Sequence, residues 1–110
     1  MVVTERRLRR LWVSTGQSPG GGLEPSAVID AVNAKLLVVT DNTANGHRSA
    51  LFRCNLDGTA CTYTGIEAGQ GLECGLSPSA LVDKASGDLL VVTANRAAGH
   101  RLGFFQVGLR

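Results

Sequence analysis

The sequence predicts an all-β fold built from two copies of one four-stranded antiparallel sheet. Three observations predict it: an internal repeat, short apolar runs rich in β-branched residues, and fourteen glycines against three prolines, a composition typical of many tight turns. The 110 residues suffice for a single domain over 1–110 with a modest core. Hydrophobic residues make up 44% and charged residues 18%, which indicates a globular chain.

The repeat has a constant spacing of 53 positions, so nothing is inserted or deleted between the copies. Apolar, polar and turn residues all take part in it. Identical pairs at this spacing include Pro25/Pro78, Asp30/Asp83, Val38/Val91, Asn42/Asn95, Gly46/Gly99, His47/His100, Arg48/Arg101 and Phe52/Phe105. Stretches of this length that recur in a sequence are the signature of architectures in which one supersecondary unit is stacked on the next.

Each copy contains the same succession of strands and turns. In the first copy, Asp57-Gly58 is a strong hairpin signal between the last two strands. We expect strands at 26–30, 36–40, 50–55 and 59–66 in the first copy, and at 79–83, 89–93 and 102–108 in the second. The second copy then stops one strand short. Residues 8–15 align with 61–68, so we expect the N-terminal strand to close the second sheet.

Two stretches carry a family resemblance. Residues 78–93, from Pro78 to Thr93, resemble the first hairpin of bacterial β-propeller repeats, and 51–59 resemble the Leu-Asp-Gly hairpin of lipoprotein-receptor-type propellers. The resemblance implies two four-stranded propeller blades, the first over about 26–66 and the second over about 79–110 plus 8–15. It implies no functional family. The aspartate box of sialidase propellers is not matched, because Gly58 follows Asp57 directly.

Two blades cannot close a ring, because propellers typically use about four to eight. We therefore expect chains to associate and complete the ring, with three copies favoured over four or two. The competing interpretation is a fragment of a longer repeat protein, whose exposed blade faces would make it sticky.

The candidate ligand-binding residues lie in the long loops, which share one end of an antiparallel meander. Functional residues concentrate in such loops more often than in tight turns. The repeated Gly-His-Arg triplets place an imidazole beside a guanidinium, a combination suited to a carboxylate or hydroxylated ligand. The alternative is that these side chains only hold the loops. The candidates are Asn42, His47, Arg48 and Gln70 in one copy and Asn95, His100, Arg101 and Gln17 at equivalent places.

No catalytic residue, metal site or cofactor is predicted. Asp30 and Asp83 sit where the chain leaves a strand, so turn capping is favoured over acid–base chemistry. A metal role for Asp41 is weak, because its counterpart is Ala94 and calcium favours clustered oxygen ligands. Duplicated loops supply near-identical groups, whereas a propeller hydrolase needs an asymmetric set.

Cys54 and Cys61 face each other across the predicted hairpin, at a Cα separation of about 5.5 Å that allows a disulfide. A disulfide would favour an oxidising compartment, whereas a reduced pair of small hydrophobic residues fits equally well. No signal peptide or segment of transmembrane length is visible. We expect a soluble chain, in a compartment that the sequence leaves open.

The function predicted is a non-enzymatic binding or scaffold module with repeated ligand sites on the long-loop face. The partners expected are other copies of the chain and a glycan or protein ligand. A net charge of +2 does not indicate nucleic acid, and no membrane partner is expected. The alternatives are a fragment of a propeller hydrolase such as a sialidase-like enzyme, or a truncated repeat without separate activity.

Overall fold

The computed structural model describes residues 21–109 and contains seven β-strands and two short 3₁₀ turns, η1 (Thr43–Asn45) and η2 (Arg96–Ala98). Strands β1 to β4 form one antiparallel sheet in that order, and β5 to β7 form a second. The strands are β1 (Leu23–Asp30), β2 (Lys35–Asn42), β3 (Arg48–Asn55), β4 (Thr62–Thr64), β5 (Leu76–Val82), β6 (Leu89–Asn95) and β7 (Arg101–Val107). No helix in this part of the chain could span a membrane.

The all-β class and the seven expected strands in this range are confirmed. The last strand of the first sheet is shorter than expected, because β4 covers only Thr62–Thr64 of the predicted 59–66. The turn before it is also wider than the two residues Asp57-Gly58, since the amide of Asn55 donates to the Thr59 carbonyl and pairing begins at Arg53 opposite Thr62. The predicted strand at 8–15 lies outside the described residues.

The two copies repeat in backbone geometry as well as in sequence. Ser26 pairs with Val39 and, 53 positions on, Ser79 pairs with Val92. Both first strands contain an irregularity near their start, where Glu24 and Ser77 each have φ of 46°. A positive φ is costly for a residue with a side chain, so its recurrence at equivalent positions indicates that the same bulge is specified in both copies.

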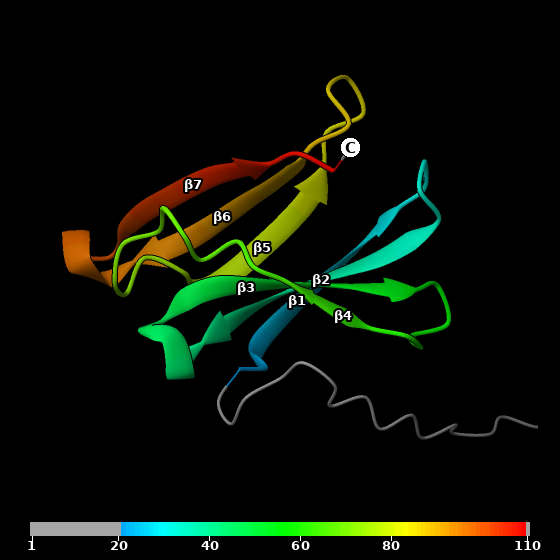
Figure 1. Ribbon diagram of the computed structural model, residues 1–110. Helices are drawn as coiled ribbons and strands as arrows, with labels where there is room; N and C mark the ends of the chain where they lie inside the picture. The colour runs from blue at the N-terminus through cyan, green and yellow to red at the C-terminus, as the bar shows by residue number, and fades with distance from the viewer. Residues whose placement is uncertain (1–20, 110) are drawn as a thin grey trace, which may run out of the picture.

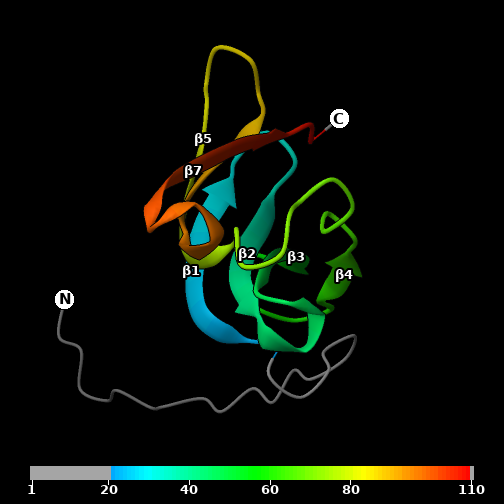
Figure 2. The ribbon, with the colours of Figure 1, turned by 90° about the vertical axis from the view of Figure 1, so that its left-hand side faces the viewer.

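The two sheets pack face to face, with β1 beside β5 (Figures 1 and 2). We call the side of each sheet that meets the other sheet its near face, and the opposite side its far face. The core between the near faces is a cluster of buried apolar side chains from both sheets, and Ala50, Phe52 and Cys54 form a second, smaller buried cluster on the far face of the first sheet. The cluster between the near faces consists of Leu37, Val39, Leu51, Leu89, Val91 and Leu109, with Val28, Ile66, Ala80, Val82, Phe105 and Val107 packed around them. Burial of this apolar area is the main stabilising contribution.

Hydrogen bonds also join the innermost strands. The Ala80 amide donates to the Ser26 hydroxyl at 3.3 Å, and the Ser77 hydroxyl donates to the Glu24 carboxylate. Ser77 is the 53-position counterpart of Glu24, so one bulge bonds to the next. The two copies are therefore stacked in a defined register.

Candidate functional site

The long loops gather at one end of the molecule, as the sequence predicted. Figure 1 shows η1 and η2 at that end, with the linker between the sheets passing close by. The linker is bonded to both: the Glu73 amide donates to the Gly46 carbonyl, the Gly75 amide to the His47 carbonyl, and the Arg96 amide to the Glu73 carbonyl. We call residues 41–48, 66–75 and 94–101 the loop end.

The first Gly-His-Arg triplet is held from two sides. Gly46 and His47 both adopt positive φ, 64° and 57°. The His47 Nδ1 atom lies 3.0 Å from a carboxylate oxygen of Asp41, which is 1% exposed. A buried carboxylate is costly without hydrogen bonds, so the contact with the imidazole offsets part of the cost of burying this acid.

Arg48 and Gln70 form a clamp between the loop and the linker. The Arg48 Nε atom donates to the Gln70 carbonyl at 2.8 Å, and its Nη1 atom donates to the Asn45 side chain at 3.0 Å. The Gln70 side chain accepts from the Ser49 amide at 2.7 Å and donates to the carbonyls of Ser49 and Ile66 at 2.9 and 3.0 Å. The Gln70 amide thus acts like an additional strand residue, completing the backbone bonding of Ser49.

Asn42 and Tyr63 meet a buried acid that the sequence analysis missed. Glu67 is 6% exposed, and its carboxylate accepts hydrogen bonds from the Asn42 side chain, the Tyr63 hydroxyl and the Ile66 amide. Partial burial, the hydrogen bond to Glu67 and the charge of Glu67 raise the pKa of Tyr63 to about 12. Only the spacing of an acid four residues after the lone tyrosine could have suggested this pair.

The second triplet has fewer contacts. Asn95 caps η2 by accepting from the Ala98 amide at 3.2 Å, whereas Asn42 makes no such cap on η1. His100 repeats the positive φ of its counterpart, but Ala94 replaces the aspartate beside it. The side chains of His100 and Arg101 are exposed and make no hydrogen bond or ion pair to the rest of 21–109, while the Arg101 backbone pairs with Asn95 at the start of β7. Gln17 lies outside the described residues.

Glu73 and Arg96 form the other charged contact of the loop end. The Arg96 guanidinium donates to the Glu73 carboxylate, and this hydrogen bond holds the pKa of Glu73 below its usual value. Both side chains are exposed, so the pair contributes little to stability. Glu73 therefore connects the linker to both loops, to the second through the Arg96 side chain and to the first through the backbone of Gly46.

A hollow of about 290 Å³ opens at the loop end beside Arg48 and Gln70. Asn45, Glu67, Ala68 and Gly69 line the rest of it. Its polar side chains already bond to each other or to the backbone. Among residues 21–109 no group of histidine, cysteine, aspartate and glutamate side chains could hold a metal ion.

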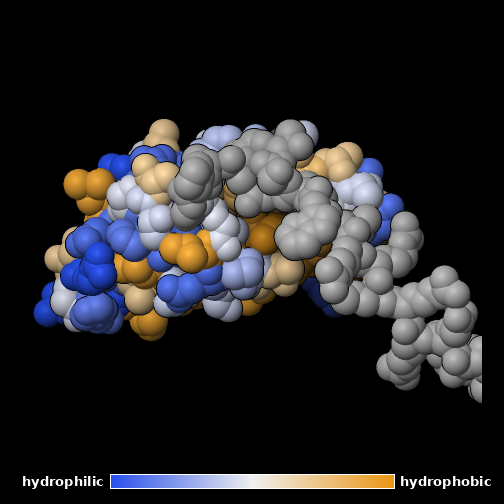
Figure 3. Space-filling view, turned by 90° about the horizontal axis from the view of Figure 1, so that it is seen from below, coloured by the Kyte–Doolittle hydropathy of each residue, from blue (hydrophilic) through white to orange (hydrophobic). Residues whose placement is uncertain are grey.

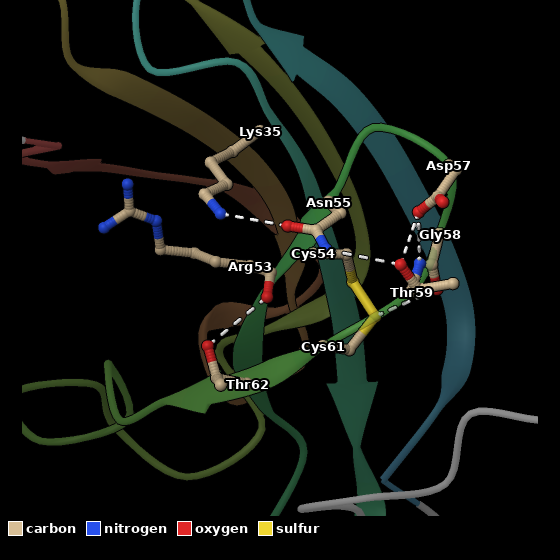
Figure 4. Close-up of a disulfide and its surroundings, with 9 residues drawn as sticks. All are labelled: Lys35, Arg53, Cys54, Asn55, Asp57, Gly58, Thr59, Cys61 and Thr62. Carbon is tan, nitrogen blue, oxygen red and sulfur yellow. Dashed lines mark hydrogen bonds between the residues drawn. A yellow bond between two sulfur atoms is a disulfide. The ribbon is translucent and has the colours of Figure 1, made fainter.

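The hairpin at the opposite end contains the disulfide Cys54–Cys61, with the Cα atoms 4.0 Å apart (Figure 4). The hairpin register that the sequence predicted places these two residues opposite each other, although the Cα atoms are closer than the 5.5 Å expected. Asp57 accepts from the Thr59 amide and hydroxyl inside the turn, and Lys35 donates to Asn55 at its base. The disulfide lies on the far face of the first sheet.

Asp30 and Asp83 both have turn contacts. Asp30 accepts from the Asn33 side chain at 2.6 Å, and Asp83 accepts from the Ala85 amide at 3.0 Å. The bond from the Ala85 amide, with a second from the Ser86 hydroxyl, holds the pKa of Asp83 below its usual value. Both carboxylates therefore act as turn caps, as expected.

The far faces are the largest features that loop-based reasoning missed. On the second sheet, Leu81, Leu102 and Phe104 are 53%, 82% and 65% exposed. On the first sheet, Ile29 and Leu56 are 59% and 53% exposed, and a hollow of about 190 Å³ lies beside the disulfide and Phe52. Figure 3 looks from below the view of Figure 1 and shows hydrophobic patches among polar ones on that side. Exposed apolar side chains therefore lie on both far faces, although Ala50, Phe52 and Cys54 on the first are only 0%, 5% and 2% exposed.

The repeat relates each far face to a buried one. The near face of the first sheet includes Val28, Leu37, Val39 and Leu51. Their 53-position counterparts lie on the far face of the second sheet and are Leu81, Leu90, Val92 and Phe104. The near face of the second sheet uses Ala80, Val82, Leu89, Val91, Phe105 and Val107. Their counterparts on the far face of the first sheet are Ala27, Ile29, Leu36, Val38, Phe52 and Cys54.

Comparison of the chain with protein-family models, with characterised proteins and with solved structures gives no match.

Proposed function

We propose that the chain is a non-enzymatic binding and scaffold module that assembles head to tail into a closed β-propeller. One observation carries this proposal: the two far faces are the 53-position counterparts of the two near faces. The surfaces that pack together inside one chain are therefore present again on its two outer sides, and no third sheet among residues 21–109 covers either of them. The far face of the second sheet of one copy packs on the far face of the first sheet of the next.

Such an interface is heterologous, because two different surfaces meet, and it closes into a ring when the rotation between neighbouring sheets is a whole fraction of a full turn. Three copies supply six sheets, within the range that propellers use. The same contact that buries Leu37 and Leu51 within a chain would bury Leu90 and Phe104 between chains. Burying a side chain of this size contributes about 1.5–3 kcal/mol.

The ligand-binding part of the proposal rests on the second Gly-His-Arg triplet. His100 and Arg101 are exposed, whereas His47 and Arg48 are occupied by Asp41, Asn45 and Gln70. An unoccupied imidazole and guanidinium in one loop suit an acidic or hydroxylated ligand such as an acidic glycan. A ring of three copies would present this pair three times on one face.

The assembly is tested by placing a charge on the far face. In Phe104→Asp the carboxylate would be buried against a neighbouring copy, so we expect dissociation to a monomer in sedimentation velocity. The matched control is Val32→Asp, at a hairpin tip that is 89% exposed and belongs to neither far face. An assembled Phe104→Asp chain, or a wild-type chain that is already monomeric, would contradict the proposal.

The ligand site is tested on a glycan array. We expect binding to acidic glycans to be lost in His100→Ala/Arg101→Ala and retained in Val32→Asp. Equal binding by the double variant would remove these residues from the site.

A further inference from the structure

The outer edges of the two sheets differ. In the first sheet, β3 is covered by β4, which pairs Leu51 with Thr64, Phe52 with Tyr63 and Arg53 with Thr62. In the second sheet, β7 occupies the place of β3, and no described strand pairs with its outer edge. The β7 sequence Arg-Leu-Gly-Phe-Phe-Gln-Val contains neither proline nor lysine to discourage pairing. An unprotected edge of seven residues is a template for another strand.

The repeat specifies which segment fits this edge. Subtracting 53 from the positions of β4 places Leu11 opposite Phe104, Arg10 opposite Phe105 and Arg9 opposite Gln106. The same rule places Leu8 opposite Val107, where the first sheet has Cys61 opposite Cys54. An apolar pair would then stand where the first sheet has the disulfide. The arginines replace the exposed residues Thr62 and Tyr63, as suits an outermost strand.

The neighbouring positions also match in kind. Ile66, which follows β4, packs against the core between the two sheets, and its counterpart is Val13. Gln70, which bonds to the backbone of Ser49, has the counterpart Gln17, and the repeat would pair Gln17 with Leu102 in the same way. The segment therefore repeats both the apolar anchor and the clamp of the first copy.

The path of the linker decides whether this strand comes from the same copy. Residues 65–75 lead from β4, in the first sheet, to β5 in a sheet that lies on the near face of the first. By the 53-position spacing, residues 8–15 correspond to β4 and lead into β1 as β4 leads into β5. They would therefore belong to a sheet that packs on the far face of β1–β4. The chain's own β5–β7 sheet lies on the near face instead. It is therefore on the wrong side to receive the strand.

We infer that residues 8–15 of one copy pair with the outer edge of β7 in the preceding copy, whose second sheet packs on the far face of β1–β4, so that each second sheet is completed by strand exchange. The partner at this edge is a second copy of the chain, and the pairing is antiparallel. This inference rests on the proposed head-to-tail assembly and adds to it a backbone contact between copies.

The test uses two single variants, Leu8→Cys and Val107→Cys, in full-length chains that also carry Cys74→Ser to remove the free thiol. One chain bears an extra tag, so that a mixed product is recognised by size. After co-expression and oxidation, we expect a disulfide-linked product of one chain of each kind on a gel without reductant. The matched control replaces Val107→Cys by Gln106→Cys, whose side chain points to the opposite face, and should give no link.

A second measurement leaves β7 unchanged. In the wild-type assembly, the β7 amides directed away from β6 should be protected from hydrogen exchange, because they pair with the partner strand. Exchange of these amides at the rate of unpaired ones would overturn the inference.

The outcomes separate the two proposals. An oligomeric wild-type chain without the Leu8–Val107 link would overturn strand exchange and leave head-to-tail packing in place. A disulfide formed within one chain of the doubly substituted Leu8→Cys/Val107→Cys protein would overturn strand exchange as well. A monomeric wild-type chain would overturn both.

Discussion

The two repeats have the same backbone but are held by different contacts. Register, bulge and left-handed turn residues recur at the same spacing, including His47 and His100 at φ of 57° and 62°. In the first repeat the loop is held by Asp41, Asn45 and Gln70, and in the second by its own Asn95 cap and by the bonds of Arg96 to Glu73. The repeated positions therefore specify the fold, whereas the positions that have diverged decide which side chains hold each loop.

Leu37 and its 53-position counterpart Leu90 should differ most in their contribution to stability. Leu37 is fully buried within one chain, so Leu37→Ala should cost about 2–5 kcal/mol in chemical unfolding. Leu90 lies on the far face, so Leu90→Ala should lower the free energy of unfolding of a dissociated chain much less. The same substitution should make the assembly dissociate more readily on dilution. Denaturant unfolding and solution mass are measured for both variants. Equal losses in the free energy of unfolding of the two monomeric variants would contradict the distinction between near and far faces.

The hairpin ends of the sheets offer a second comparison, because Cys54–Cys61 is replaced by Val107 and Leu8 in the other repeat. The disulfide closes a short loop, with a sequence separation of 7, and should stabilise the fold by about 2 kcal/mol. We expect the free energy of unfolding to fall by that amount when reductant is added. A Cys54→Val/Cys61→Leu chain, which copies the second repeat, should be insensitive to reductant.

The two histidines isolate the effect of Asp41. His47→Ala and His100→Ala remove the same side chain from the same left-handed conformation, so the backbone cost cancels. His47→Ala also leaves the buried Asp41 carboxylate without its imidazole partner, and should cost about 1.5–3 kcal/mol more. Equal losses, measured by denaturant unfolding, would show that the Asp41 contact contributes nothing.

The smallest expected effect concerns Tyr63, the only tyrosine in the chain. Its pKa is raised to about 12 in the folded chain, from 10.0 when unfolded. Because the folded pKa is the higher one, the stabilisation is complete below pH 10 and is lost as the pH rises through 12. Tyrosinate absorbance should show the higher midpoint in the folded chain and a lower one in Glu67→Gln. Identical titration midpoints in the wild-type chain and Glu67→Gln would show that Glu67 does not raise the pKa of Tyr63.

Much of the fold could be predicted because it depends on local signals and on the repeat. Alternating apolar residues located the strands, and the Asp57-Gly58 turn placed Cys54 opposite Cys61. The contacts of Gln70 and Glu67 could not be predicted, because they depend on how the linker passes the first loop. The alternation of side chains along β2 puts Leu36 and Leu37 on opposite sides of the sheet. It does not show which of these two residues points toward the neighbouring sheet. The meaning of the far faces therefore required the packed structure.

The most direct test of the central claim is the mass of the wild-type chain in solution, measured by light scattering coupled to gel filtration. The account predicts one sharp species at three times the 11.5 kDa chain mass. In it, the far faces of neighbouring copies are paired as the near faces are paired within each chain. A species at the mass of a single chain would contradict the account.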